Sequence, residues 1–334
     1  MVDRNTDFFQ IVDNFAKIAH IPSIQIIKAT LDFVPKVSIA IPTYKRPELL
    51  KLALDSALNQ TDYSDFEVIV VDNDPVRDSE TEKMMSYYQN PKISYYKNGI
   101  NIGMFGNWNR CIQLSSGEYI SILNDDDLLH PSYLENVMKI IISGHPVGLF
   151  VRFSTFTNDL IPVYERYKSI SLKKITFIDN LYANTNAGSL GITVKRNNLV
   201  ELGGFNELFY PTSDYVLWAN YIKEYGAIYQ INEILAFYRL SVNTSLNSDL
   251  HLSFIKNDLI LLDQMIGLFN PLYKMIAKGA RPVLVYGKYL GMCIFSPEFC
   301  SKNKNEINNI KSQQTFKSRL FYRLLGVLNR LSKI

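Results

Sequence analysis

The chain has 334 residues, a formal net charge of +3, and ordinary shares of hydrophobic (47%) and charged (20%) residues. This composition is typical of a globular protein with a sizeable core, and so small a charge gives no reason to expect a nucleic-acid partner. The three cysteines form no C-x-x-C pair, which argues against a disulfide framework or a zinc site and favours a reducing compartment. We expect no signal peptide, because the first residues show no positive segment that leads into an apolar one, and no membrane span, because no uncharged apolar run approaches about 18 residues.

Residues 1–36 carry apolar side chains at helical spacing up to Pro22, which predicts a partly helical leader packed on the main domain. From Val37 onward, short apolar strands alternate with amphipathic helices. The expected strands are 37–41, 66–71, 93–96, 119–123 and 147–153, and the expected helices begin near 47, 79, 104 and 131. Strands that are apolar almost throughout predict an α/β fold with a mostly parallel sheet buried on both faces.

Polar residues follow three of these strands. Pro42-Thr43-Tyr44 closes the first, Asp72-Asn73 the second, and the run 124–127 the strand that begins at Tyr119. Ligands of open parallel sheets bind outside the carboxyl ends of the strands, so we expect these ends to converge on one site. The adjacent carboxylates of 124–127 repel one another, and Mg²⁺ or Mn²⁺ prefers carboxylate oxygens, which favours a metal site over the alternative of a solvated acidic loop.

The joint order of the motifs over residues 37–245 resembles family 2 glycosyltransferases of the GT-A fold. The motifs, in chain order, are Ser38–Arg46, Val70–Asn73, Asn101–Gly103, Gly117–Asp127, Gly203–Glu207, Ser213–Trp218 and Tyr238–Arg239. The resemblance implies an inverting enzyme that takes a sugar from a nucleotide-diphosphate donor, most often a UDP-sugar. It also implies a divalent cofactor, Mn²⁺ or Mg²⁺.

The resemblance assigns roles on the nucleotide side of the donor site. Asp72 matches the acid that contacts the base, and Pro42, Thr43 and Tyr44 border that base. Asn101 belongs to the same cofactor-binding set. Two structural alternatives stay open: Asp72 can form an Asx-turn, and Tyr44 can be a turn aromatic that covers the sheet edge.

On the diphosphate side, Asp125 matches the acid near the ribose, and Asp126 matches the acid that holds the metal. Relatives often have Asp where this chain has Asn124, so the register can shift by one residue and Asp127 then shares the metal. Arg239 is expected either to meet a phosphate or to pair with an acid of the domain.

Asp214 matches the general base that removes the proton of the acceptor hydroxyl. The family carries an acidic pair here, and Ser213 replaces its first member. An acid in the first helical turn is also favoured by the helix macrodipole, so helix capping is the alternative role. The acceptor surface is expected to include residues 180–191. Ser241 stands where many relatives have a histidine, which puts that metal or phosphate contact in doubt.

The prediction divides the chain into the leader 1–36, the glycosyltransferase domain 37–245 and a helical extension 246–334. In the extension we expect a helix over 250–269, a packed apolar segment at 283–294, a polar linker at 302–314 and a basic amphipathic helix at 316–334. One face of that helix carries Phe316, Leu320, Leu324, Val327, Leu328 and Leu331. Such a helix can lie in an anionic membrane interface, and the alternative is a core-packing or dimer-forming helix.

These features predict a cytoplasmic glycosyltransferase, peripheral at the inner face of the membrane, that elongates a glycan or lipid-linked glycan in bacterial surface-polysaccharide assembly. A homodimer is compatible with this prediction. Two alternatives stay open. A nucleotidyltransferase shares a related sheet, but Pro42–Arg46 occupies the place of its glycine-rich phosphate loop. A catalytically inactive sugar-binding or scaffolding subunit is suggested by Ser213 and Ser241.

Overall fold

The structure is a computed structural model that describes residues 3, 6–144, 147–157, 162, 164, 165, 167, 169–184, 188–240 and 248–333. Ser241, and with it the expectation of a lost histidine contact, lies outside the described residues. The strands are β1 (Ser23–Ile27), β2 (Val37–Thr43), β3 (Phe66–Asp72), β4 (Ile93–Asn98), β5 (Tyr119–Ile122), β6 (Leu128–Leu129), β7 (Gly148–Phe156), β8 (Leu172–Ile175), β9 (Ile192–Lys195) and β10 (Ile228–Arg239).

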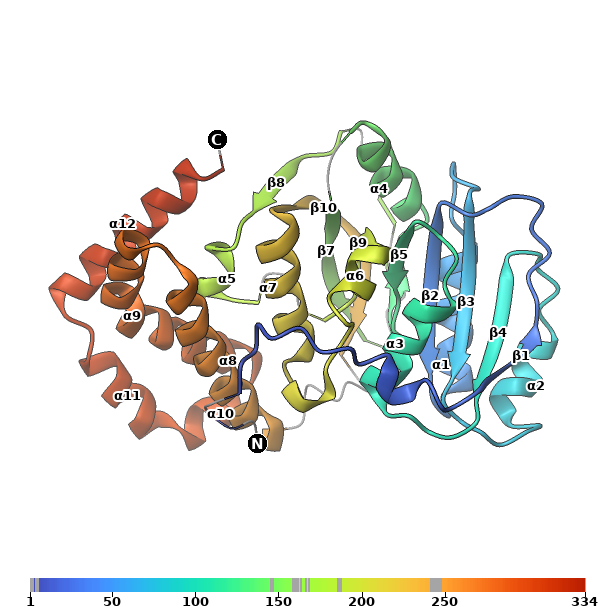
Figure 1. Ribbon diagram of the computed structural model, residues 1–334, viewed down its shortest axis with the longest axis horizontal. Coiled ribbons are helices and arrows are strands. Elements are labelled where there is room, and N and C mark those ends of the chain that lie inside the picture. The colour runs from blue at the N-terminus through green and yellow to red at the C-terminus, as the bar shows by residue number, and fades with distance from the viewer. Residues whose placement is uncertain are drawn as a thin grey trace.

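Helices cover the sheet and form the C-terminal part of the molecule (Figure 1). Those of the sheet region are α1 (Pro47–Leu58), α2 (Glu80–Ser86), α3 (Met104–Leu114), α4 (Tyr133–Ile142), α5 (Asp179–Tyr182), α6 (Arg196–Glu201) and α7 (Ser213–Tyr225). The C-terminal helices are α8 (Ser248–Leu268), α9 (Pro271–Phe295), α10 (Pro297–Lys302), α11 (Lys304–Ser312) and α12 (Phe316–Leu331). Two 3-10 turns are η1 (Ala16–Ile18) and η2 (Glu207–Phe209).

Within the described residues, one mixed sheet runs in the order β1-β4-β3-β2-β5-β9-β7-β10-β6, with β8 paired to β10. The expected parallel core is confirmed, because β4, β3, β2 and β5 are mutually parallel neighbours. Beyond β5 the sheet becomes mixed: β9 is antiparallel to both β5 and β7, while β10 is parallel to β7. Short antiparallel strands such as β6 and β8 carry few residues, so their apolar pattern is too brief to predict from sequence.

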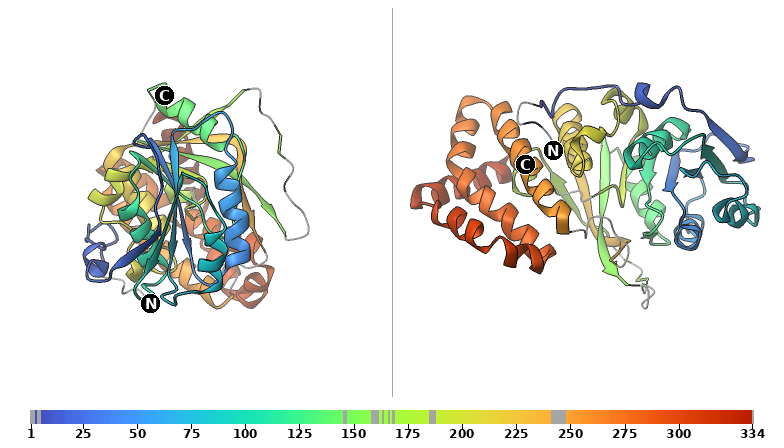
Figure 2. Two further views of the ribbon diagram at one scale, coloured as in Figure 1. Left: turned by 90° about the vertical axis from the view of Figure 1, so that its right-hand side faces the viewer. Right: turned by 90° about the horizontal axis from the view of Figure 1, so that it is seen from below.

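Apolar side chains fill both faces of the sheet, as near-continuous apolar strands require. On one face β2, β3 and β4 pack against α1, α2 and α4, with Leu50 and Leu134 fully buried. On the other face the same strands and β5 pack against α3, α6 and α7, with Ile112 and Trp218 buried. Figure 2 shows the strands between these two helical layers. This sandwich fixes where the strand ends lie.

The N-terminal segment contradicts the expected helix. Of residues 8–19, only η1 is helical, and β1 then pairs antiparallel with β4 and forms the edge of the sheet. The carboxylates of Asp7 and Asp13 accept hydrogen bonds from backbone N–H groups two residues on, at Phe9 and Phe15. Such local bonds compete with helix formation and explain why apolar spacing misled here. The segment instead crosses α7 as an extended strap (Figure 1).

The C-terminal helices form a bundle at one end of the molecule (Figure 2). Its core includes Leu262, Ala277 and Leu325 from three of these helices, and it is continuous with Tyr215 of α7. The expected linker at 302–314 is wrong, because α11 occupies it and buries Ile307 and Ile310 three residues apart on one helical side. None of the helices in the described parts of the chain is long and apolar enough to cross a membrane.

Gly203 lets the N-terminal strap approach the main domain. Its φ is +76°, and a Cβ atom at this position would lie 2.0 Å from the carbonyl oxygen of Val12. Gly226 has a similar φ of +91° but no atom within 4 Å of the same position. A side chain at either position would therefore strain the backbone, and at Gly203 it would also clash with the backbone of Val12.

We predict that Gly203→Ala lowers the unfolding free energy by about 1–3 kcal/mol more than Gly226→Ala, because the clash falls on backbone that must shift. Urea denaturation followed by circular dichroism measures both. Limited proteolysis should cut the strap of Gly203→Ala faster than that of Gly226→Ala. Equal losses of stability in the two variants would show that the strap does not press on this turn.

Candidate functional site

The carboxyl ends of β2, β3 and β4 are level. Thr43 pairs with Asp72, and Asp72 pairs with Lys97, in the registers of these parallel strands. The side chain of Asp72 is fully buried, and its Oδ2 accepts hydrogen bonds from Tyr95 (2.7 Å) and from the ammonium of Lys97 (2.8 Å). Its Oδ1 accepts from the backbone N–H of Asp74, which is the Asx-turn considered as the alternative. The buried Asp72 thus holds the ends of β3 and β4 together through its hydrogen bonds.

Asn101 and Tyr44 flank the same strand ends. The Oδ1 of Asn101 accepts from Asn73 Nδ2 (2.7 Å) and from the backbone N–H of Gly103 (2.9 Å), which shapes the turn before α3. Tyr44 is 41% exposed, beside the buried Pro42. The Tyr44 ring is therefore accessible to a ligand at the carboxyl ends of the strands, whereas the buried side chain of Asp72 is not.

Asp125 and Asp126 lie directly beside the end of β2. The Oδ2 of Asp125 accepts a hydrogen bond from Thr43 Oγ1 (2.8 Å), and Arg46 Nη1 lies 3.5 Å from Asp125 Oδ1 and 3.2 Å from Asp126 Oδ2. Burial raises the pKa of Asp125 to about 6 and also raises that of Asp126, although Arg46 opposes both shifts. The expected convergence of the first and last strand ends is confirmed by these contacts. The two carboxylates need a cation, and Arg46 supplies one.

Asp127 faces the interior instead. Its side chain is fully buried, and its oxygens accept from the backbone N–H of Arg239 (2.9 Å) and from Asn124 Nδ2 (2.8 Å). Burial and the neighbouring Asp126 raise its pKa to about 7. The guanidinium of Arg239 donates through Nε to the carbonyl of Asp126 (2.8 Å) and lies 4.4 Å from the ring centre of Phe156. The Arg239 guanidinium thus joins β10 to residues 124–127, the acidic run that follows β5.

Asp214 stands in the first turn of α7 and binds the segment before β9. Its Oδ2 accepts from the backbone N–H of Gly188 (2.9 Å) and from Asn184 Nδ2 (3.2 Å). Trp218, one turn later on α7, donates its Nε1–H to the carbonyl of Gly188 (2.8 Å). Asp214 and Trp218 therefore hold Gly188 from both sides of its backbone, which explains their spacing of four residues. Burial raises the pKa of Asp214.

Gly188 and Ser189 connect Asp214 to the acidic run. While Gly188 binds Asp214, the hydroxyl of Ser189 donates to Asn124 Oδ1 at 3.4 Å. Two adjacent residues thus span the space between the start of α7 and the end of β5. The two features that the sequence separates by about 90 residues share one corner of the molecule.

The corner formed by residues 124–127, Gly188, Ser189 and Asp214 fits a divalent ion that is bound partly by the protein and partly by the substrate. No cluster of three or more metal-binding side chains exists among the described residues. Nucleotide sites, however, often hold Mg²⁺ or Mn²⁺ with one or two carboxylates and complete the shell with phosphate oxygens and water. Asp126 meets this need, since within the described residues the one side-chain hydrogen bond to its carboxylate comes from Arg46 at 3.2 Å. Asp127 meets it poorly, because both of its oxygens are engaged within the fold.

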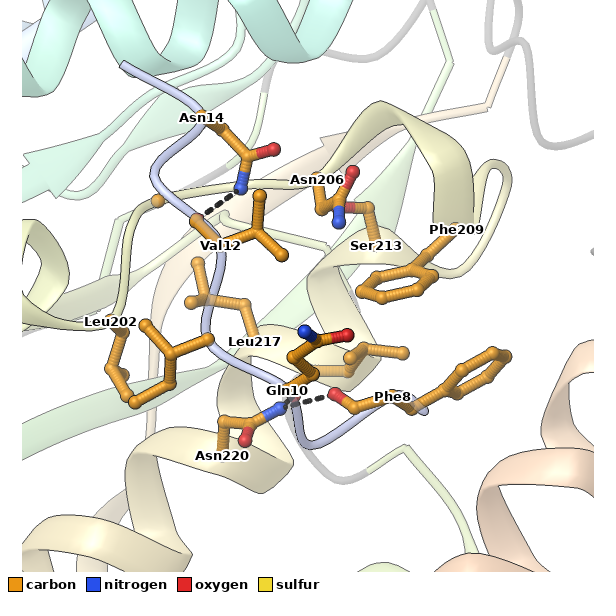
Figure 3. A pocket seen from close by; sticks show the side chains of 13 residues that line it. Phe8, Gln10, Val12, Asn14, Leu202, Asn206, Phe209, Ser213, Leu217 and Asn220 are labelled. Atoms are coloured by element: carbon orange, nitrogen blue, oxygen red, sulfur yellow. Dashed lines mark hydrogen bonds between the residues drawn. The ribbon is translucent and has the colours of Figure 1, made fainter. Parts of the chain in front are cut away.

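A cavity of about 20 Å³ lies between α7 and the N-terminal strap (Figure 3). Phe8 and Val12 of the strap close it against Phe209 and Asn220. Ser213 faces this cavity, whereas the next residue, Asp214, bonds Gly188. The space suits about one water molecule and is far too small for a sugar. Ser213 is 1% exposed and so takes no part in the corner that Asp214 shares with the acidic run.

Comparison with known proteins identifies the family. The family model described as "Glycosyl transferase family 2" matches residues 38–193. An uncharacterized glycosyltransferase of Methanocaldococcus jannaschii is 30% identical over 229 residues, which are 66% of this chain and 75% of that protein. The chain belongs to glycosyl transferase family 2.

Two further proteins extend the comparison of this glycosyltransferase. The Escherichia coli enzyme named UDP-Glc:alpha-D-GlcNAc-diphosphoundecaprenol beta-1,3-glucosyltransferase WfgD is 27% identical over 207 residues, 61% of this chain and 77% of that enzyme. The crystal structure of S. aureus TarS 1-349 in complex with UDP-GlcNAc aligns with a TM-score of 0.53 at 16% identity, over 89% of this chain and 92% of that one. The predicted GT-A fold and glycosyltransferase class are confirmed.

Sequence reasoning gave no contact at this site to three residues of this family 2 glycosyltransferase: Arg46, Lys97 and Gly188. It placed Arg46 only within a motif and Gly188 only within the expected acceptor surface 180–191. Arg46 and the aspartates that it contacts are about 80 residues apart, so no local spacing shows their contact. Lys97 follows an apolar strand, a position that is typical of a solvent-exposed lysine at a strand end. Gly188 lies in a polar segment that gives no periodic signal.

We predict that Lys97→Met destabilises the protein by about 3–5 kcal/mol, because it leaves the buried carboxylate of Asp72 without its cation. Urea denaturation gives the free energy of unfolding. The double variant Lys97→Met/Asp72→Asn should recover part of this loss, since no uncompensated charge is then buried. Lys51→Met removes an exposed helical pair with Asp55 and serves as the control without a resolvable change. Additive losses in the double variant would contradict the coupling.

Proposed function

We propose that this family 2 glycosyltransferase inverts the anomeric centre of a UDP-sugar and transfers the sugar to a hydroxyl of a lipid-linked glycan. One observation carries the proposal: Gly188 and Ser189 bind Asp214 and the 124–127 run at the same time. A base and a diphosphate-binding corner must lie within one substrate length of each other, and this link brings the two groups together.

In this proposal Asp214 is the general base. Its carboxylate is oriented by the backbone N–H of Gly188 and by Asn184 Nδ2, and its raised pKa makes it a stronger base than an exposed aspartate. The attacking hydroxyl would lose its proton to this carboxylate as it approaches the anomeric carbon. Gly188 keeps the carboxylate oriented during that transfer.

In the same proposal Asp126 holds a divalent ion, Mn²⁺ or Mg²⁺, and Asp125 faces the ribose. A bound divalent ion supplies neutralising charge to a departing diphosphate. Arg46 supports this corner from the protein side, because it already balances Asp125 and Asp126 in their partly buried setting. The exposed ring of Tyr44 borders the base, and Arg239 maintains the acidic run through its bond to the Asp126 carbonyl.

The substrates are proposed from the relatives. WfgD is named for a UDP-Glc donor and a diphosphoundecaprenol acceptor, and it is alike over most of its length. We extend these classes to this chain, with surface-polysaccharide assembly as the setting. A polyprenyl-linked acceptor would place the enzyme at the cytoplasmic face of the membrane.

Asp214→Asn should lower kcat by about 10²–10⁴-fold, the range for loss of a general base. The asparagine Oδ1 can still accept from Gly188, so the fold should persist. Release of UDP with a lipid-linked acceptor measures turnover, and Asp263→Asn, an exposed acid of α8 paired with Arg281, is the matched control. Unchanged turnover in Asp214→Asn would remove Asp214 from this role.

The pH profile tests the same residue. Burial raises the pKa of Asp214, and only the deprotonated carboxylate can act as base. The acidic limb of kcat/KM should therefore lie above the ordinary aspartate value of about 3.9, and activity should fall as the pH falls through it. Asp214→Glu should move this limb. A limb at the ordinary value, unmoved in Asp214→Glu, would assign it to another group.

Thermal-shift measurements with UDP-, GDP- and dTDP-sugars, each with and without Mn²⁺, test the donor corner. We expect stabilisation by UDP-sugars that increases with Mn²⁺, because a ligand that binds the native state raises its stability. Asp126→Asn should lose the Mn²⁺ dependence, whereas Asp127→Asn should lower the melting temperature and keep that dependence. The reverse pattern would move the metal to Asp127 and shift the register by one residue.

A further inference from the structure

Helix α12 presents an apolar stripe to solvent. The stripe consists of Phe316, Leu320, Leu324, Val327 and Leu331, whose exposed fractions are 85%, 48%, 42%, 45% and 59%. These positions lie on one side of a helix with 3.6 residues per turn. Of the apolar face expected from sequence, only Leu328 is partly buried against the bundle core. A core-packing role for this stripe is therefore wrong.

The opposite side of α12 is firmly held. Leu325 is fully buried, and the ring of Phe321 packs onto α9 where Gly279 has no side chain: a Cβ there would lie 2.3 Å from the ring. Asn329 donates to Asp179 Oδ1 (2.8 Å) and accepts from Thr176 Oγ1 (2.8 Å), both before or within α5. The helix cannot turn its stripe inward without breaking these contacts.

Basic residues flank the stripe. Arg319, Arg323 and Arg330 follow one edge at helical spacing and Lys317 lies near the other, and all four are exposed. The helix contains no acidic residue, and in the described part of the chain these four cations form no ion pair. The exposed surface of α12 therefore combines apolar side chains with positive charge that no acidic residue of the described chain pairs with.

We propose that α12 lies in the interface of an anionic lipid bilayer, with the stripe at the acyl boundary and the arginines at lipid phosphates. Interfacial helices have this division of faces, and their binding combines apolar burial with attraction to anionic lipids. A second copy of the chain fits less well, because α12 against α12 brings like charges together. The inference concerns the location of the enzyme and does not depend on the identity of donor, acceptor or base.

Sedimentation of the full chain with vesicles tests the proposal. We expect binding to phosphatidylcholine vesicles that contain 30 mol% phosphatidylglycerol, in excess of binding to pure phosphatidylcholine by about tenfold or more, since each basic residue near the surface adds to the attraction. High salt should reduce the excess. Binding that is absent, or equal for both vesicle types, would overturn the proposal.

Substitutions are preferable to deletion, because removal of α12 would also remove buried residues such as Leu325 and Asn329. The stripe variant Leu320→Gln/Leu324→Gln/Val327→Gln should lose binding about tenfold or more, and Arg319→Gln/Arg323→Gln/Arg330→Gln should lose the preference for anionic vesicles. Leu52→Gln, an equally exposed leucine on α1, is the control and should bind as the unmodified chain does.

Circular dichroism and UDP release with a soluble acceptor analogue check that each variant is folded and active, so failed membrane binding stays distinguishable from failed catalysis. Analytical ultracentrifugation identifies the competing occupant. If the unmodified chain is a dimer that the stripe variant dissolves, and neither sediments with vesicles, a second copy covers the stripe and the proposal is wrong.

Discussion

The site depends on three parallel strands that end at one level. Because Thr43, Asp72 and Lys97 are register partners, the buried Asp72–Lys97 pair lies under the surface on which Asp125 meets Thr43. A buried pair of opposite charges tolerates little displacement, since a shift would leave a charge without its partner. The position of the pair therefore limits how far β3 and β4 can slide past one another, and Asp72 is in turn the register partner of Thr43 on β2. Because Thr43 contacts Asp125, the aligned strand ends also fix the position of Asp125.

A second support comes from the far side of the sheet. Helix α7 holds Gly188 through Asp214 and Trp218, and Gly188 is followed by the residue that reaches Asn124. Tyr215, next to Asp214, is bound by the buried Lys288 of α9 at 3.2 Å, and Lys288 lies 3.7 Å from Asp258 of α8. The helical extension is thus continuous with the site. Charged groups of two helices, α8 and α9, therefore meet at the tyrosine that follows the candidate base.

Apart from the two-residue strand β6, the regular elements of residues 37–156 follow from sequence because their apolar runs are long and are closed by proline, glycine or acidic residues. The N-terminal segment and α11 do not, since Asp7 and Asp13 divert the backbone into turns and the two buried isoleucines of α11 are too few to reveal a face. At the site, sequence order predicts Asp126 and Asp214. It cannot predict that Asp127 and Asp72 point inward, because only the packed strands decide which carboxylates keep solvent.

The hydrogen bonds of Asn329 to Asp179 and Thr176 also fix a distance within the molecule. They join α12 rigidly to α5, and the chain runs from α5 within a few residues to Asn184, a partner of Asp214. If the enzyme rests on α12 as proposed, the height of Asp214 above the lipid surface is then a constant of the fold. With Asp214 as the proposed base, the length of the acceptor glycan would become a selection criterion in its own right, because a sugar that is too near to or too far from the bilayer could not reach it.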